Sequence, residues 1–181
     1  MTVSDSGVGG YRVSEQSILQ TERIRMDDRN AEFDVIGVGA VAVDDLIYVD
    51  EYPAADSKVR TLHRERQGGG QTGTALVAAA RYGARCAYAG QLGRCELSRY
   101  VESVFDAERI DHSHAPRTSD GVPAHSTIIV EQKHDTRTIL STVADEGLGP
   151  ADELPDLELL ARCRVLLVDH HRPVATLRLV R

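Results

Sequence analysis

The residues best suited to binding a polar ligand form a glycine-rich run followed by short polar side chains. Gly68-Gly69-Gly70-Gln71-Thr72-Gly73-Thr74 directly precedes an Ala-rich stretch, which predicts a helix that ends at Gly83. Glycines let the backbone approach a ligand closely, and a helix N-terminus has N–H groups that can donate to ligand oxygens. On these residues alone, a ligand site and a flexible loop with a helix cap are equally good interpretations.

Two glycine patterns resemble nucleotide-binding motifs but lack a required feature. The run Gly68–Gly73 has the glycine spacing of a P-loop, yet Thr74 stands where the phosphate-binding lysine is needed. The segment Gly37–Ala42 formally matches a dinucleotide fingerprint. The residues after it favour an extended strand, whereas the fingerprint needs a helix whose N-terminus faces the pyrophosphate. We therefore expect a tight strand exit there, and a dehydrogenase half is the weaker alternative.

Three aspartates stand beside apolar, strand-like runs. Asp44 and Asp45 follow the first run, and Asp169 follows Val165–Val168. Ligands of open α/β sheets bind beyond the carboxyl ends of the strands, where a carboxylate can accept hydrogen bonds from sugar hydroxyls. For any single aspartate, a solvated loop carboxylate is the simpler interpretation.

Histidines and cysteines give little support for a metal site. The segments 111–114 and 169–171 each contain an aspartate and two histidines, but neither has the spacing of a recognised metalloenzyme motif. Cys86, Cys95 and Cys163 form no CxxC pair. This pattern argues against a zinc ribbon or a disulfide scaffold and favours a reducing cytoplasm. We expect no metal ligands in this chain.

The bulk composition is that of a soluble globular domain. The chain has 181 residues, of which 41% are hydrophobic and 27% charged. Its formal net charge of −7 argues against nucleic acid or an anionic membrane as the main partner. The sequence has no apolar run of about 18 residues and no secretory pattern at its N-terminus. We therefore expect a cytoplasmic protein without a membrane span.

The order of the predicted elements indicates an α/β fold. Residues 1–31 are polar without a sustained period, so we expect a disordered extension, with Met26 as an alternative first residue. Buried strands then alternate with helices, which favours a parallel sheet, and the half-exposed strands suggest a separate small sheet. The predicted strands are 35–38, 46–49, 58–66, 86–89, 126–130, 137–141 and 165–168, and the predicted helices are 72–81, 97–105 and 156–161, with a further helix start at 173.

The segment from Gly68 to Ala84 resembles the first signature of the PfkB/ribokinase family of carbohydrate kinases. That signature is a Gly-Gly loop followed by an Ala-rich helix that ends in Leu/Tyr-Gly-Ala. The resemblance runs from about Phe33 to the C-terminus and is strongest to ketohexokinase-like members. Further features occur in the family's order, namely Asp44, Val49–Pro53, Lys58–Arg66, Asp120–Pro123 and Arg137–Ile139.

The resemblance implies a ribokinase-like three-layer αβα fold, C-terminally truncated, over residues 32–181. It implies a parallel sheet and a small β-lid with strands near 45–66 and 125–142, through which family members often dimerise. The implied activity is ATP- and Mg²⁺-dependent phosphorylation of a sugar or sugar-like alcohol, with the sugar bound between sheet and lid. The implied substrate-binding residues are Asp44, Gly69, Gly70, Gln71, Thr74, Arg137 and Asp169.

Two local departures from the family pattern bear on the substrate. Asn is usual at the positions of Gln71 and Thr74, and Gly-Asp-Asp is common where Gly93–Glu96 stands here. Gln71 keeps an amide on a longer side chain, and Thr74 keeps only a hydroxyl. The resemblance therefore does not identify the sugar.

A larger departure bears on catalysis. The family's later Gly-Ala-Gly-Asp segment supplies the base and an anion hole, and an Asn-x-x-Glu segment helps to organise magnesium; neither occurs in this sequence. We therefore expect the position of the family's base to lie beyond Arg181, the last residue given. It follows that we expect no catalytic residue in this chain and no kinase activity from it alone. The alternative is a truncated homologue that binds a sugar or dimerises without catalysis.

Overall fold

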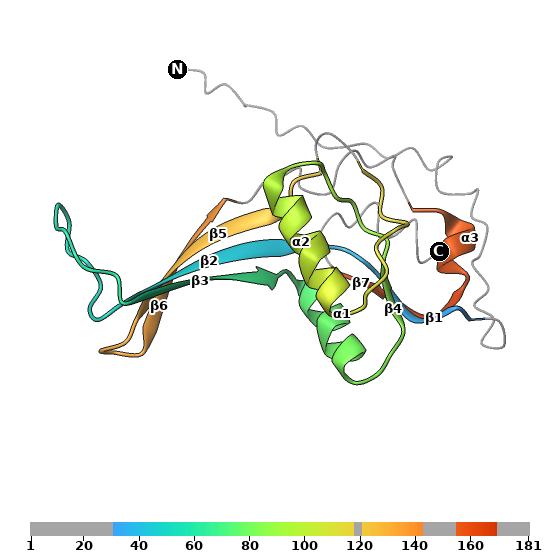
Figure 1. The fold of residues 1–181 in the computed structure, drawn as a ribbon, viewed down its shortest axis with the longest axis horizontal. Helices are drawn as coiled ribbons and strands as arrows, with labels where there is room; N and C mark the ends of the chain where they lie inside the picture. The colour runs from blue at the N-terminus through green and yellow to red at the C-terminus, as the bar shows by residue number, and fades with distance from the viewer. Residues whose placement is uncertain (1–30, 118–120, 143–154, 170–181) are drawn as a thin grey trace, which may run out of the picture.

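The structure is a computed structural model that describes residues 31–117, 121–142 and 155–169 (Figure 1). The described elements are β1 (Phe33–Val38), β2 (Ala42–Val49), β3 (His63–Gly69), α1 (Gln71–Arg81), β4 (Cys86–Tyr88), α2 (Glu96–Ala107), β5 (Ala124–Glu131), β6 (Thr136–Thr142), α3 (Leu157–Leu160) and β7 (Cys163–Val168).

Some sequence predictions fall outside the described residues. They concern residues 1–30 of the expected extension, Asp120, the histidines at 170 and 171, and the expected helix start at Pro173. Arg181 also lies outside these ranges, since the description ends at Asp169. The expectation that the family's base lies beyond Arg181 therefore stays a prediction.

The first sheet is parallel and has helices on both faces. Its strand order is β4-β1-β7, with Ile36 opposite Ala87 and Val38 opposite Val168. One face packs against α1 through the fully buried Leu76. The other face packs against α3 through the buried Leu160. This arrangement of helix, sheet and helix confirms the expected αβα layering.

The second sheet extends away from the helices as a curved blade (Figure 1). Its strand order is β3-β2-β5-β6, in which β2 and β5 run parallel and the two outer pairs are antiparallel. We call it the lid sheet. The strands β5 and β6 form the hairpin that the sequence predicts over 126–141, with a turn at Asp135, where φ is +54°.

Two strands differ most from the sequence prediction in their boundaries. The strand β2 begins at Ala42 instead of Leu46, and β3 covers His63–Gly69 instead of Lys58–Arg66. The cause is pairing, because Ala42 lies opposite Gly69 and the ladder continues from there to Tyr48 opposite His63. Alternation of polar and apolar side chains predicts burial of one face, whereas the backbone ladder decides where a strand begins and ends.

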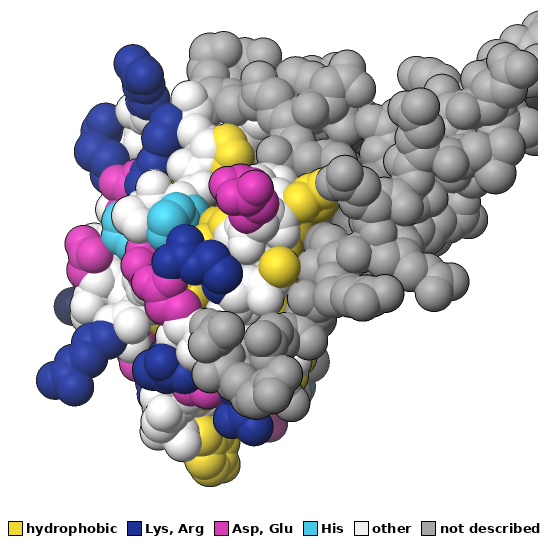
Figure 2. All heavy atoms as spheres, turned by 90° about the vertical axis from the view of Figure 1, so that its right-hand side faces the viewer, with side chains coloured by type: hydrophobic (Ala, Val, Ile, Leu, Met, Phe, Trp, Pro, Cys, Tyr) yellow, Lys and Arg dark blue, Asp and Glu magenta, His cyan; other side chains and the backbone are white. Residues whose placement is uncertain are grey.

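The helix α2 packs on β2 and β3 of the lid sheet, whereas α1 packs mainly on β1 and β4 of the parallel sheet and reaches β3 (Figure 1). The periodicity that predicts a helix over 97–105 is confirmed, since α2 buries Val101 and Phe105 on one face. Among the described residues, no helix is long and apolar enough to cross a membrane. On the face shown in Figure 2, acidic and basic side chains are interspersed rather than gathered by sign.

Candidate functional site

Asp169 lies just beyond the carboxyl end of β7 and joins three separate segments. Its Oδ2 accepts a hydrogen bond from the backbone N–H of Ala40 at 2.6 Å and another from the Thr72 hydroxyl at 2.9 Å. Because β7 runs parallel beside β1, the end of β7 reaches the turn that follows β1. Asp169 therefore connects that turn to the start of α1.

Close packing around Asp169 requires glycine in the turn after β1. A Cβ at Gly39 would lie 2.4 Å from Asp169 Oδ2 and 2.2 Å from Thr72 Oγ1. The Gly39 carbonyl in turn accepts a hydrogen bond from the Tyr88 hydroxyl at 2.9 Å. Complete burial raises the pKa of Tyr88 far above its usual value, and the charge of Asp169 adds to the effect. The glycine pattern that resembles a dinucleotide fingerprint thus forms a tight strand exit.

Asp44 lies in β2 and faces the glycine loop that leads into α1. In the lid sheet it stands opposite Gln67 on one side and Ser126 on the other. A Cβ at Gly69 would lie 2.8 Å from Asp44 Oδ2, so the carboxylate contacts the loop backbone directly. A carboxylate in this place can accept hydrogen bonds from ligand hydroxyls that approach along the loop.

Gly70 gives the loop a conformation that other residues rarely adopt. Its φ is +84°, and a Cβ there would lie 2.5 Å from the Ala40 carbonyl oxygen. It also occupies the N-cap position of α1, where no side chain caps the helix. The predicted order of a glycine run followed by a helix is confirmed, and a role of this run in ligand binding stays a prediction.

Gln71 and Thr74 lie on the first turn of α1, and both are exposed. The Thr74 amide donates to the Gly70 carbonyl at 2.9 Å, and the Gly73 amide to the Ala40 carbonyl at 3.3 Å. These two N–H groups hold the helix start in place.

Arg137 shares a sheet face with Asp44 but lies far from it. Arg137 stands opposite Val130, which stands opposite Tyr48, four residues along β2 from Asp44. Four residues of strand span about 13 Å, and two further strands add about 10 Å across the sheet. The structure therefore places Arg137 at the outer part of the lid sheet. The residues that it brings together are Asp44, Gly69, Gly70, Gln71 and Thr74.

A polar network on the opposite face of the lid sheet was not predicted from the sequence. Asp45 accepts a hydrogen bond from Arg66 Nε at 2.6 Å and lies 2.7 Å from His125 Nε2. Hydrogen bonding from Arg66 lowers the pKa of Asp45 to about 2 against the opposing effect of burial, and His125 lowers it further. Arg66 also pairs with Glu96 on α2. The alternation of side chains along a strand was the sequence signal that could have placed Asp44 and Asp45 on opposite faces of the sheet.

Thr72 makes a second contact near the candidate site that sequence reasoning missed. Its side chain is buried, with 1% of its surface exposed, and its hydroxyl donates to Asp169 across 97 residues of sequence. No local pattern links the start of α1 to the end of β7. Its position in the helix was predicted, but its partner was not.

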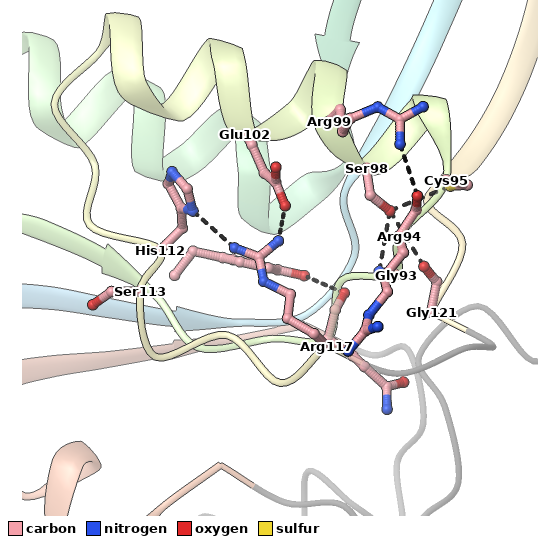
Figure 3. A network of polar contacts seen from close by, with 12 residues as sticks. Gly93, Arg94, Cys95, Ser98, Arg99, Glu102, His112, Ser113, Arg117 and Gly121 are labelled. Carbon is pink, nitrogen blue, oxygen red and sulfur yellow. Dashed lines mark hydrogen bonds and ion pairs between the residues drawn. The ribbon is translucent and has the colours of Figure 1, made fainter.

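The loop ahead of α2, where the sequence departs from the family pattern, is held by a buried serine (Figure 3). The Ser98 hydroxyl accepts from the Gly93 amide at 3.1 Å and donates to the Gly121 carbonyl at 3.3 Å. Cys95 Sγ lies 3.3 Å from the same hydroxyl. The loop thus carries Arg94 and Cys95 at the positions where the resemblance leads one to expect aspartates.

Comparison with known proteins identifies the family of this chain. The model of the pfkB family carbohydrate kinases matches residues 34–169. The chain belongs to this family. Mouse ketohexokinase is 30% identical over 109 residues, which make up 60% of this chain and 37% of the mouse protein.

Solved structures agree on the fold. A candidate ribokinase from Agrobacterium tumefaciens superposes with a TM-score of 0.70 at 25% identity, over 81% of this chain and 47% of that one. Arabidopsis thaliana ribokinase in complex with ribose and ATP gives 0.68 at 12% identity, over 81% and 48%. The chain thus spans about half the length of these kinases. The predicted ribokinase-like fold is confirmed.

Proposed function

We propose that this chain carries the sugar-binding part of an ATP-dependent kinase that phosphorylates a sugar or a related alcohol. The observation that carries the proposal is the Asp44 carboxylate held against the glycine loop at the start of α1. A carboxylate accepts hydrogen bonds from sugar hydroxyls, and a backbone without side chains lets the ring approach. The proposed substrate-binding residues are Asp44, Gly69, Gly70, Gln71, Thr74, Arg137 and Asp169.

These residues take different roles in the proposal. Asp44 binds the hydroxyls, and the Gln71 amide and Thr74 hydroxyl select among sugars. Asp169 acts through the turn and helix that it joins, because its Oδ2 already accepts two hydrogen bonds. Arg137 is included on the family resemblance alone, because it lies far from Asp44 along the lid sheet. Related proteins suggest the first ligands to test, since one is a ketohexokinase and another holds ribose and ATP.

ATP and Mg²⁺ are the proposed cofactors of the complete reaction. Among the described residues, no group of three or more His, Cys, Asp or Glu side chains could hold a metal ion. We therefore assign no described residue to magnesium. The sequence up to Arg181 contains no Gly-Ala-Gly-Asp segment, and we propose that this chain alone does not transfer phosphate. Release of ADP that depends on both ATP and sugar, from the pure chain, would overturn this part.

The proposal includes the domain bounds, the cellular location and the partners of the chain. Residues 32–181 would form the kinase portion and residues 1–31 an extension. The protein would act in the cytoplasm on a small-molecule sugar, without nucleic acid or membrane, and copies would pair through the lid sheet. The second candidate function is sugar binding or dimerisation without catalysis.

Titration calorimetry with D-fructose and D-ribose tests the sugar site. Asp44→Asn removes the charged acceptor, and we expect the dissociation constant of the bound sugar to rise at least tenfold, since hydrogen bonds to charged groups contribute about 1.5–3 kcal/mol. Asp50→Asn, on the exposed bend after β2, is the matched control and should bind as the unmodified chain does. Equal binding by the Asp44 variant and the unmodified chain contradicts the proposed site.

A further inference from the structure

A row of polar side chains crosses the lid sheet on the face that carries Asp44. In the register of the sheet, Asp44 on β2 stands opposite Ser126 on β5, and Ser126 stands opposite Ser141 on β6. Residues that stand opposite each other on neighbouring strands share a face, and such strands lie about 4.8 Å apart. The three side chains therefore form a line of about 10 Å that begins at the proposed sugar-binding carboxylate.

The neighbouring rows on the same face are apolar and differ in height. Toward the glycine loop, Ala42 stands opposite Gly69 on one side and Ala124 on the other. The next row away from the loop contains Leu46, Ile128 and Ile139. Because alanine and glycine have the shortest side chains, they leave space over the sheet between the polar row and the loop. A ligand in that space would have the polar row along one side, and the aliphatic row would exclude water behind it.

The Ser126 hydroxyl has hydrogen-bonding capacity that its neighbours use poorly. Ser126 is buried, with 9% of its surface exposed. Among the described residues its side chain has one partner, Ser141 Oγ, to which it donates at 3.5 Å. That distance is longer than the roughly 2.5–3.0 Å of ordinary hydroxyl hydrogen bonds, and a buried hydroxyl without a good partner is unfavourable. A ligand hydroxyl beside Asp44 would supply a better partner.

Asp44 and Ser126 offer different hydrogen-bonding chemistry. An ionised carboxylate only accepts hydrogen bonds, whereas a serine hydroxyl donates one and accepts others. Two such groups on adjacent strands suit two hydroxyls on neighbouring carbons, of which the first donates to Asp44 and the second pairs with Ser126. Sites that hydrogen-bond a substrate hydroxyl discriminate strongly against an analogue that lacks it, because the site's polar groups are then left unpaired.

We propose that Ser126 is a specificity-determining residue of the sugar site and that the substrate has hydroxyls on two neighbouring carbons, one bound by Asp44 and the next by Ser126. Ser141 orients the Ser126 hydroxyl from the other side of the row. This inference rests on the proposed function, because that proposal assigns Asp44 to the sugar.

Titration calorimetry of the 181-residue chain with D-fructose and D-ribose tests the role of Ser126. We expect Ser126→Ala to raise the dissociation constant of the bound sugar by about threefold to tenfold, the effect of one neutral hydrogen bond. Thr127→Ala is the matched control, because Thr127 follows on the same strand but stands opposite Asp45, on the other face. Unchanged affinity in the Ser126 variant overturns the inference and leaves the proposed function standing. A chain that binds neither sugar overturns both.

Singly deoxygenated analogues of the sugar that binds more tightly identify the hydroxyls involved. With the unmodified chain, we expect the loss of either of two neighbouring hydroxyls to weaken binding by about threefold or more. The analogue without the hydroxyl bound by Ser126 should bind the unmodified chain and the Ser126→Ala variant equally, since both pairs lack the same hydrogen bond. The comparison on the unmodified chain decides the matter even where the variant does not fold. Losses confined to one hydroxyl, or a variant that weakens every analogue alike, overturn the inference.

Discussion

Asp44 and Asp45 are neighbours in the sequence, but β2 directs their carboxylates to opposite faces of the lid sheet. Asp44 faces the glycine loop, where a ligand can reach it. Asp45 faces α2 and is occupied by Arg66 and His125. In the proposed function the first aspartate recognises the ligand, and the second stabilises the strands that carry the first.

The fold requires a residue without a side chain at Gly70, and Gly83 is a matched comparison. Both have positive φ, but a Cβ at Gly70 would lie 2.5 Å from the Ala40 carbonyl oxygen, whereas a Cβ at Gly83 meets nothing within 4 Å. We expect Gly83→Ala to lower the free energy of unfolding by about 1 kcal/mol and Gly70→Ala by about 3 kcal/mol. Urea denaturation measures both, and equal losses would mean that the steric clash is not a factor.

Thr72 tests the connection between α1 and β7. Thr72→Val keeps the shape of the side chain but leaves Asp169 without one of its donors, and we expect a loss of about 1–3 kcal/mol in the free energy of unfolding. Thr74→Val changes an exposed position two residues later and should alter stability by less than about 0.5 kcal/mol. A Thr72 variant as stable as the Thr74 variant would show that the hydrogen bond contributes nothing to the fold.

At the scale of elements, the network around Asp45 joins three strands and a helix. Asp45 on β2 contacts Arg66 on β3 and His125 on β5, and Arg66 pairs with Glu96 on α2. The Tyr100 hydroxyl adds a second contact from α2 to the Arg66 carbonyl. These contacts orient the lid sheet against α2.

The depressed pKa of Asp45 predicts a loss of stability in acid. A carboxyl with a pKa of about 2 in the folded chain and a higher one in the unfolded chain stabilises the fold above its unfolded pKa. This contribution is lost as the pH falls from about 4 toward 2. At neutral pH we expect Asp45→Asn to cost only about 1 kcal/mol, because the side chain is partly exposed.

Unfolding curves between about pH 2 and pH 7 measure this effect. The Asp45→Asn variant should lose less stability than the unmodified chain as the pH falls from about 4 to about 2. Asp56→Asn, at an exposed turn, is the control and should follow the unmodified chain. Parallel pH profiles for all three proteins would exclude Asp45 as the titrating group.

At the scale of the whole molecule, the parallel sheet exposes an apolar side chain, Val165, on β7. This strand pairs with β1 on one side and with no described strand on the other, and Val165 is 52% exposed. Edge strands with exposed apolar side chains promote association between chains. The 181-residue chain should therefore self-associate through β7 as its concentration rises.

Val165→Lys tests that association. A charge on an edge strand opposes pairing with another chain, so we expect sedimentation to show a smaller associated fraction at the same concentration. Val59→Lys is the matched control, because Val59 is 45% exposed but lies in the loop before β3. A similar reduction by both variants would attribute the effect to net charge rather than to the strand edge.

Several features of this protein follow from the sequence by itself. Apolar spacing over 97–105 predicts α2, because one helix face must be buried wherever the helix lies. The glycine loop and the Ala-rich helix are likewise local features, since positive φ and helix propensity belong to individual residues. Together with the family resemblance, they were enough to predict the parallel sheet, the lid sheet and the position of the glycine loop.

The tertiary structure decided which distant residues meet. Asp169 reaches Thr72 and Ala40 only because β7 docks in register beside β1. Because it pairs with β2, β3 extends to Gly68 and Gly69, beyond the end of the predicted strand. The register of the lid sheet places Arg137 far from Asp44. These relations depend on contacts between segments that lie tens of residues apart in the sequence. Local propensity does not predict such contacts, because the free energy of strand pairing depends on the residues of both strands.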